Sequence, residues 1–191
     1  MVVWGVRLFV AVNFSPDERS RILEVQERLR SQVLKGSFTR PENLHLTLAF
    51  LGETWDRGRS PEGKLPLLFR VMEEVRFSPF DITFSLTGFF RRGQTELWWL
   101  TAAEHPGLSL LKDVHGQLLK YLLKAGFPAD TRPFKAHITL GREIKSSAPI
   151  VLSSPEIPVK VERISLMVSE RVRGVLTYTA VRTPESVSQI H

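Results

Sequence analysis

Two copies of one short pattern constrain this chain more than any other feature: HLTL at residues 45–48 and HITL at residues 137–140. Because alternate side chains of a β-strand point to opposite faces, each copy predicts a strand with one apolar face. In the first copy that face would hold Leu44, Leu46, Leu48 and Phe50, and in the second Ala136, Ile138 and Leu140. The opposite faces would present His45 beside Thr47 and His137 beside Thr139.

The surroundings of the two copies also repeat. A strand, a long helix, a turn and a motif strand are expected in roughly residues 6–52 and again in 95–142. Arg7 and Trp99 each lie 38 residues before the motif histidine of their own half. Matched spacing of unlike sequences indicates a duplication. Two such halves, packed about a pseudo-two-fold axis, would bring both imidazoles to one shared cleft.

Other elements follow from capping residues and periodicity. Ser15 and Glu18 form a predicted capping box that opens a helix, which is expected to end at Gly36. Further helices are expected from residue 61 or 66 to 75 and from Pro106 to Gly126. Strands are expected over residues 7–14, 80–89, 95–102, 160–168 and 175–182, with a loop at 52–63.

Composition narrows the class of protein. The chain has 191 residues, 42% of them hydrophobic, which suits one soluble domain over residues 1–191. With no cysteine, disulfides, thiol catalysis and thiolate metal sites are excluded. Arg7 interrupts the apolar run at the N-terminus, so we interpret this run as a strand and not as a signal peptide. We expect a cytoplasmic protein without a membrane association. The net charge of +6 favours a polyanionic ligand, either a nucleic acid or a small phosphate.

Two imidazoles and two hydroxyls are sufficient for acid–base work on a phosphoryl group. Threonine is also a good strand former, so Thr47 and Thr139 have a purely structural alternative. The other three histidines, His105, His115 and His191, lie in a turn, a leucine stripe and the C-terminus, and we expect no catalysis from them. Because no HExxH or similar ligand spacing occurs, we expect neither a metal nor a cofactor.

Several residues near the motifs have two interpretations. Arg142 follows the second motif and Arg7 interrupts an apolar strand, so both could bind an anion, or simply be solvated. The aromatic pairs Phe89-Phe90 and Trp98-Trp99 could stack on bases, but we expect at least one member of each pair in the core.

Four segments together resemble the two-histidine phosphoesterases: RLFVAV (7–12), PENLHLTLAFLGE (41–53), RPFKAHITLGR (132–142) and LMVSE (166–170). The resemblance is greatest to the bacterial and archaeal RNA 2′,3′-cyclic phosphodiesterases, formerly named 2′-5′ RNA ligases, and spans nearly the whole chain. One departure is Ala136, where relatives often carry proline, and it changes no catalytic group. The resemblance implies a bilobal α+β fold, with an antiparallel sheet and helices in each lobe and one motif strand per lobe facing a central cleft.

By the same resemblance, the substrate and partner is an RNA end with a 2′,3′-cyclic phosphate, opened to a 2′-phosphate, and no obligatory protein partner is expected. His45 would be the proton donor and His137 the proton acceptor, although their symmetry makes these roles exchangeable from the residues alone. Thr47 and Thr139 would hold the non-bridging oxygens, and Arg142 and Arg7 would bind substrate. Two alternatives stay open: an RNA-end-binding or 2′-5′ ligating protein, and a phosphodiesterase for a small cyclic nucleotide.

Overall fold

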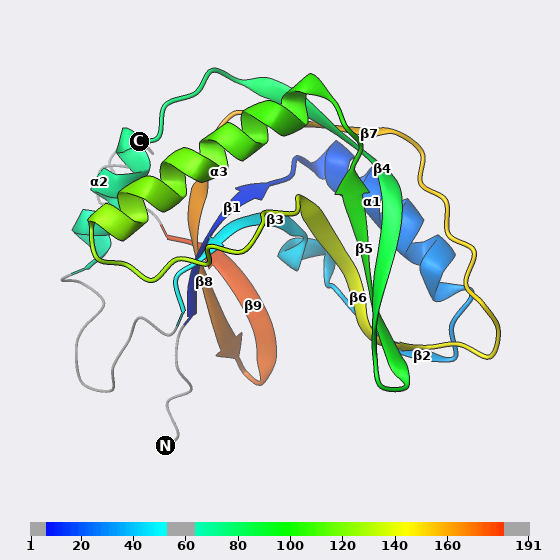
Figure 1. Ribbon diagram of the computed structural model, residues 1–191. Coiled ribbons are helices and arrows are strands. Elements are labelled where there is room, and N and C mark those ends of the chain that lie inside the picture. Colours follow the sequence, from blue (N-terminus) through cyan, green and yellow to red (C-terminus); the bar gives the residue numbers. More distant parts are fainter. Residues whose placement is uncertain (1–6, 53–63, 182–191) are drawn as a thin grey trace, which may run out of the picture.

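The computed structural model describes residues 7–52 and 64–181, which form two antiparallel sheets and three α-helices (Figure 1). The sheet that carries His45, hereafter the His45 sheet, has the order β3-β1-β8-β9: His45–Phe50, Arg7–Asn13, Ser165–Val172 and Val175–Ala180. The sheet that carries His137, hereafter the His137 sheet, has the order β2-β6-β5-β4-β7: Lys35–Phe38, His137–Lys145, Thr95–Ala102, Phe80–Arg92 and Ile157–Val161. The predicted α+β class is confirmed.

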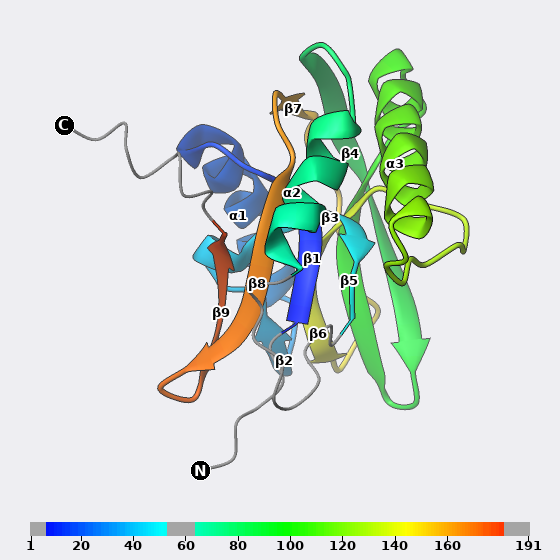
Figure 2. The same ribbon diagram turned by 90° about the vertical axis from the view of Figure 1, so that its left-hand side faces the viewer.

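The helices are α1 (Pro16–Arg30), α2 (Leu65–Glu74) and α3 (Pro106–Lys124), and a short 3-10 helix, η1, spans Pro41–Asn43. Figure 2 shows α1 and α3 on opposite sides of the strands. Within the described residues, no helix is both long and apolar enough to cross a membrane.

The start of α1 is as predicted, but its end is not. The Glu18 amide donates to Ser15 Oγ and the Ser15 amide donates to the Glu18 carboxylate, which completes the capping box. The helix ends at Arg30, whereas Gly36 lies in β2. A Cβ at Gly36 would come within 2.3 Å of Ile144 Cδ1, so the glycine allows β2 to pack closely on β6.

One hydrophobic core unites the two sheets. Buried side chains of both belong to the same cluster, which includes Val10 and Leu46 of the His45 sheet and Ile138 of the His137 sheet. Gln26 of α1 is buried, and its amide donates to the carbonyl oxygens of Leu140 and Thr39, each at 2.8 Å. Helix α1 is therefore bound to the His137 sheet, although it belongs to the first half of the chain.

The prediction of one strand over residues 160–168 is wrong, because parts of two strands occupy this stretch. β7 ends at Val161 and pairs with β4 in the His137 sheet, whereas β8 begins at Ser165 and pairs with β1 in the His45 sheet. The chain crosses between sheets within three residues. The last strand, β9, ends at Ala180, and most of the loop predicted at 52–63 lies outside the described residues.

A β-bulge in β3 corrects the predicted faces of the first motif. Val10 pairs with Ala49 and Ala11 with Thr47, so Leu48 is an extra residue on β3. Leu44, Leu46 and Leu48 are buried as predicted, but the alternation then shifts and Phe50 is 59% exposed. Ala136, Ile138 and Leu140 of the second motif are all buried, as predicted.

The strand pairing also shows that equal spacing did not identify equivalent residues. Thr139 lies opposite Trp99, whereas Thr47 lies opposite Ala11. Arg7 lies four residues before Ala11 and pairs with Ser169 of β8. The structural counterpart of Trp99 is therefore Ala11 and not Arg7.

Candidate active site

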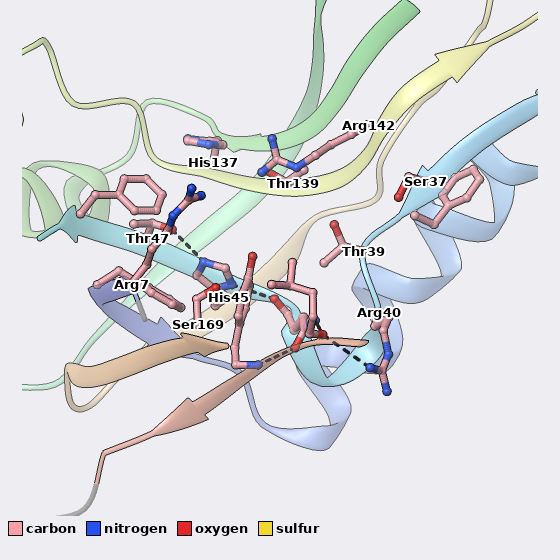
Figure 3. Close-up of a pocket in the computed structure, with 16 residues that line it drawn as sticks. Arg7, Ser37, Thr39, Arg40, His45, Thr47, His137, Thr139, Arg142 and Ser169 are labelled. Atoms are coloured by element: carbon pink, nitrogen blue, oxygen red, sulfur yellow. Dashed lines mark hydrogen bonds between the residues drawn. The ribbon is translucent and has the colours of Figure 1, made fainter. Parts of the chain in front are cut away.

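The two motif strands line one cavity of about 540 Å³. β3 and β6 contact each other although they belong to different sheets. Figure 3 shows His45 and Thr47 on one wall, with His137 and Thr139 across from them. The fold therefore brings together the four residues that the sequence singled out.

Each histidine is held by the carbonyl two residues before it. His45 Nδ1 lies 2.7 Å from the Asn43 carbonyl oxygen, and His137 Nδ1 lies 2.8 Å from that of Lys135. A carbonyl oxygen can only accept, so each Nδ1 carries a hydrogen and Nε2 is left for proton exchange. In the neutral state of His45, the Thr47 hydroxyl donates to Nε2, 2.8 Å away.

The His45 ring lies in apolar surroundings. The Phe9 ring centroid is 4.8 Å from it, and the Tyr178 ring meets it edge-on at 5.2 Å. Burial is the largest influence on the pKa of His45 and lowers it below the ordinary value of 6.5. The hydrogen bond to the Asn43 carbonyl opposes this effect, and the nearby His137 and Arg142 lower the pKa further.

We expect an NMR titration to place the pKa of His45 below 6.5 in the ligand-free protein. Because Arg142 contributes to the depression, Arg142→Gln should raise this pKa, whereas Arg70→Gln on the remote helix α2 should not. Between the lowered folded pKa and 6.5 the unfolded chain binds more protons. The free energy of unfolding should therefore fall as the pH decreases through this window. Titration of His45 at or above 6.5 would contradict the burial argument.

The cavity is rich in cations. Arg7, Arg40 and Arg142 line it, and among the described lining residues there is no carboxylate. Arg7 lies on the His45 wall and Arg142 beside the His137 wall (Figure 3), so both arginines singled out in the sequence reach the cavity. Arg40 pairs with Glu42, which is not a lining residue. The arrangement suits an anion that lies between the histidines.

Asn43 connects two parts of the cavity wall, although the sequence did not single it out. Its side chain is 5% exposed, donates to the Leu176 carbonyl at 2.9 Å and accepts from the Tyr178 amide at 3.1 Å. Since its own carbonyl holds His45, Asn43 links β9 to the His45 ring. An asparagine two residues before a motif histidine is the signal that could have revealed it.

Other lining residues carried no recognisable sequence signal. They are Ser37, Phe38, Thr39 and Arg40 before the first motif, and Ser169, Leu176 and Tyr178 of β8 and β9. Ser169 lay within the quoted LMVSE segment, but its place beside Arg7 follows only from strand pairing.

His105 and His115, both expected outside the site, have structural roles, whereas His191 lies outside the described residues. His105 accepts from the Gly107 amide and caps α3, and buried His115 stacks on Phe134 with ring centroids 4.2 Å apart. In the described part of the chain, no three His, Cys, Asp or Glu side chains gather as metal ligands.

The two aromatic pairs differ in whether one member is buried in the core. Trp98 is in the core, as predicted for one member of its pair, and the Trp99 ring lies 6.4 Å from the His137 ring. The corresponding expectation for the other pair is wrong, because Phe89 and Phe90 are 50% and 61% exposed. They lie near the end of β4, close to the β4–β5 hairpin tip, and pair with Trp98 and Leu97.

Comparison with known proteins decides the family. Residues 12–98 match the family model described as LigT like Phosphoesterase. Over 147 residues the chain is 37% identical to the RNA 2′,3′-cyclic phosphodiesterase of Archaeoglobus fulgidus, covering 76% of this chain and 77% of that protein. The chain belongs to the LigT-like phosphoesterases.

The LigT-like fold extends beyond the residues that the family model matches. Crystalline Escherichia coli LigT in its apo form superimposes with a TM-score of 0.73 at 27% identity, covering 92% of this chain and 94% of that one. A crystal structure from Thermus thermophilus gives a TM-score of 0.66 at 32% identity, with coverages of 92% and 95%. The family model matches residues 12–98, which contain only the first motif. The two structural comparisons each cover 92% of the chain.

Proposed function

We propose that this LigT-like phosphoesterase opens the 2′,3′-cyclic phosphate at an RNA end and leaves a 2′-phosphate. The observation that carries the proposal is the pair of histidines, each held at Nδ1, on opposite walls of one arginine-lined cavity. Relatives named RNA 2′,3′-cyclic phosphodiesterase support the substrate class, including one from E. coli that is 29% identical over 92% of this chain. E. coli LigT has also been crystallised with 3′-AMP and with phosphate.

The reaction needs one base and one acid. His137 Nε2 takes a proton from the water that attacks phosphorus, and the bond from phosphorus to O3′ breaks as the new bond forms. His45 Nε2 gives its proton to the departing O3′ oxygen, so the product carries a 3′-hydroxyl and a 2′-phosphate. The Nδ1 anchors keep both rings aimed during this exchange.

The lowered pKa of His45 fits the role of acid once substrate is bound. A low pKa makes the protonated ring a stronger acid, but it also reduces the protonated fraction in the free protein. The anionic phosphodiester, placed between the rings, favours the charged imidazolium and restores the proton. The leaving oxygen then replaces Thr47 as the partner of Nε2, which frees the Thr47 hydroxyl for a non-bridging oxygen.

Charge that builds on the phosphoryl oxygens is met by donors on both walls. Thr47 and Thr139 supply hydroxyls, and Arg7 and Arg142 add a positive field. Preorganised donors stabilise the transition state more than the ground state, because the developing charge is largest there.

Substrate comparison tests the proposed function. We expect rapid opening of an oligoribonucleotide with a 2′,3′-cyclic phosphate end and no action on a 3′,5′-cyclic nucleotide. A preference for the 3′,5′-cyclic nucleotide would favour the small-molecule alternative. Formation of a 2′-5′ linkage with an added 5′-hydroxyl RNA, faster than hydrolysis, would favour the ligating alternative.

The proposed chemistry predicts activity without added metal. The imidazoles supply both proton transfers, and the hydroxyls and arginines supply the charge stabilisation. We therefore expect the hydrolysis rate to remain unchanged in excess EDTA. A loss of activity in EDTA that a divalent ion restores would overturn the two-imidazole mechanism.

A further inference from the structure

A second hollow of about 550 Å³ lies beside the active-site cavity. The two spaces share Ser37 and Arg142, which pair across β2 and β6. The far end of the second hollow is formed by the β4–β5 hairpin, through Arg92, Thr95 and Leu97. A nucleotide chain that leaves the active site past Arg142 would therefore reach this hollow.

Side chains on one face of β4 and β5 form a row that leads away from the catalytic residues. Trp99 lies opposite Thr139 on one side and Gly88 on the other, and a Cβ at Gly88 would touch its indole at 2.8 Å. Directly paired and alternate residues share a face, so Leu97 with Phe90, and Thr95 with Arg92, follow on the same face. From Trp99 to Thr95 the row covers about 13–14 Å, at roughly 3.4 Å per residue. One phosphate cannot contact both ends.

The charges of the hollow favour an anion at its far end. Arg91 pairs with Glu96 at 2.8 Å, and the other carboxylate oxygen of Glu96 accepts from Trp98 Nε1, so this acid is neutralised. Among the residues that the structure describes, Arg92 has no ion-pair partner. Glu143 also lines the hollow and opposes anion binding there.

The adjacent phenylalanines of the hairpin differ in their surroundings. Phe89 stacks on the core residue Trp98, with ring centroids 4.9 Å apart and an interplanar angle of 22°. Phe90 lies opposite Leu97 on the face of Arg92, is 61% exposed, and stacks on no other ring in the described part of the chain. An exposed aromatic ring beside an unpaired arginine suits a nucleotide, since bases stack on aromatic faces.

We propose that the second hollow binds the nucleotide upstream of the cyclic phosphate, with its phosphate at Arg92 and its base on Phe90. This inference rests on the proposed function and makes the protein prefer substrates of at least two nucleotides. Arg92 and Phe90 are specificity-determining residues that do not contact the reacting phosphate.

The test compares kcat/KM on three substrates: a nucleoside 2′,3′-cyclic phosphate, a dinucleotide with the same cyclic end, and that dinucleotide with a neutral methylphosphonate linkage. We expect Arg92→Ala to lower the rate on the natural dinucleotide about tenfold, as for a lost charge-assisted contact, and to leave the mononucleotide unchanged. The methylphosphonate should reduce the wild-type rate by a similar factor, and Arg92→Ala should then have no further effect. Phe90→Ala should cost roughly fivefold or more on both dinucleotides only.

Matched variants separate this site from general effects. Arg70→Ala on α2 removes the same charge far from the hollow, and Phe89→Ala removes the neighbouring ring on the opposite face, so neither should alter dinucleotide preference. Glu143→Gln should raise the rate on the natural dinucleotide. One outcome would overturn the second site while the proposed function stands. In it, the wild type hydrolyses the mononucleotide, and Arg92→Ala lowers kcat/KM equally, or not at all, on the mononucleotide and the natural dinucleotide. Failure of the wild type on every substrate would overturn both.

Discussion

His45→Ala is expected to lose roughly 10²- to 10⁴-fold in rate on RNA with a 2′,3′-cyclic phosphate, the usual contribution of a general acid. The ribose O3′ is a poor leaving group and needs the proton that His45 supplies. Nitrophenolate, as a leaving group, is stable as an anion and needs no proton. On a nucleotide nitrophenyl phosphodiester, the same variant should therefore retain most of the wild-type rate. Steady-state kinetics on the two substrates measures the difference.

His137→Ala is the matched partner in this comparison. Because the attacking water still requires a base, we expect this variant to be impaired on both substrates. His105→Asn, outside the cavity, should retain activity on both and serves as the control. If His137→Ala recovers its rate on the nitrophenyl substrate and His45→Ala does not, the acid and base assignments are reversed. Rescue of neither variant, with intact binding, would defeat this division of labour.

The second large effect is expected from the motif hydroxyls. Thr47→Val and Thr139→Val retain the strand shape but remove a donor to the phosphoryl oxygens, which should cost about 2–4 kcal/mol at the transition state for each. That cost corresponds to roughly 30- to 1,000-fold in kcat. The expected effect is on kcat, because the donors meet charge that is greatest in the transition state.

Serine variants separate the hydroxyl from the strand residue. Thr47→Ser and Thr139→Ser keep the oxygen and should recover most of the activity that the valine variants lose. Thermal unfolding should show little change in any of the four proteins. If both valine variants turn over at the wild-type rate, the threonines are only strand residues and the phosphate must be held by other groups.

The sequence predicted which motif residues meet across the cavity, because strand alternation depends only on local backbone geometry. The two copies of the motif identified the four residues that meet across the cavity, and Arg7 and Arg142 also reach it. The capping box of α1 is another local signal, and it also formed as predicted. The origin of the two halves by duplication stays a prediction.

Features that depend on distant pairing could not be predicted in this way. The bulge at Leu48, which exposes Phe50, is visible only in the register of β3 against β1. The crossing between Val161 and Ser165 lies within a continuous strand-like sequence, and only the choice of partner strand divides it. Gly36 resembled a helix terminator but lies in β2, where a Cβ would overlap the end of the Ile144 side chain.

The missed site residues share the same cause. Arg40 and Tyr178 reach the cavity from segments without a motif, and Ser169 takes its place there only through the pairing of β8 with β1. β9 contributes only after it pairs with β8. Asn43 links these parts, since its side chain bonds to β9 and its carbonyl to His45. The burial of His45 between Phe9 and Tyr178, which lowers its pKa, is likewise a tertiary property.

The most direct test of the central claim identifies the product of the wild-type reaction. RNA with a 2′,3′-cyclic phosphate end should be incubated with the protein in EDTA, and the position of the phosphate determined by ³¹P NMR. We expect a 2′-phosphate beside a free 3′-hydroxyl, and no product from a protein that lacks both His45 and His137. A 3′-phosphate would contradict the proposed cleavage of the bond from phosphorus to O3′. Product formation by the variant without both histidines would contradict the two-histidine mechanism.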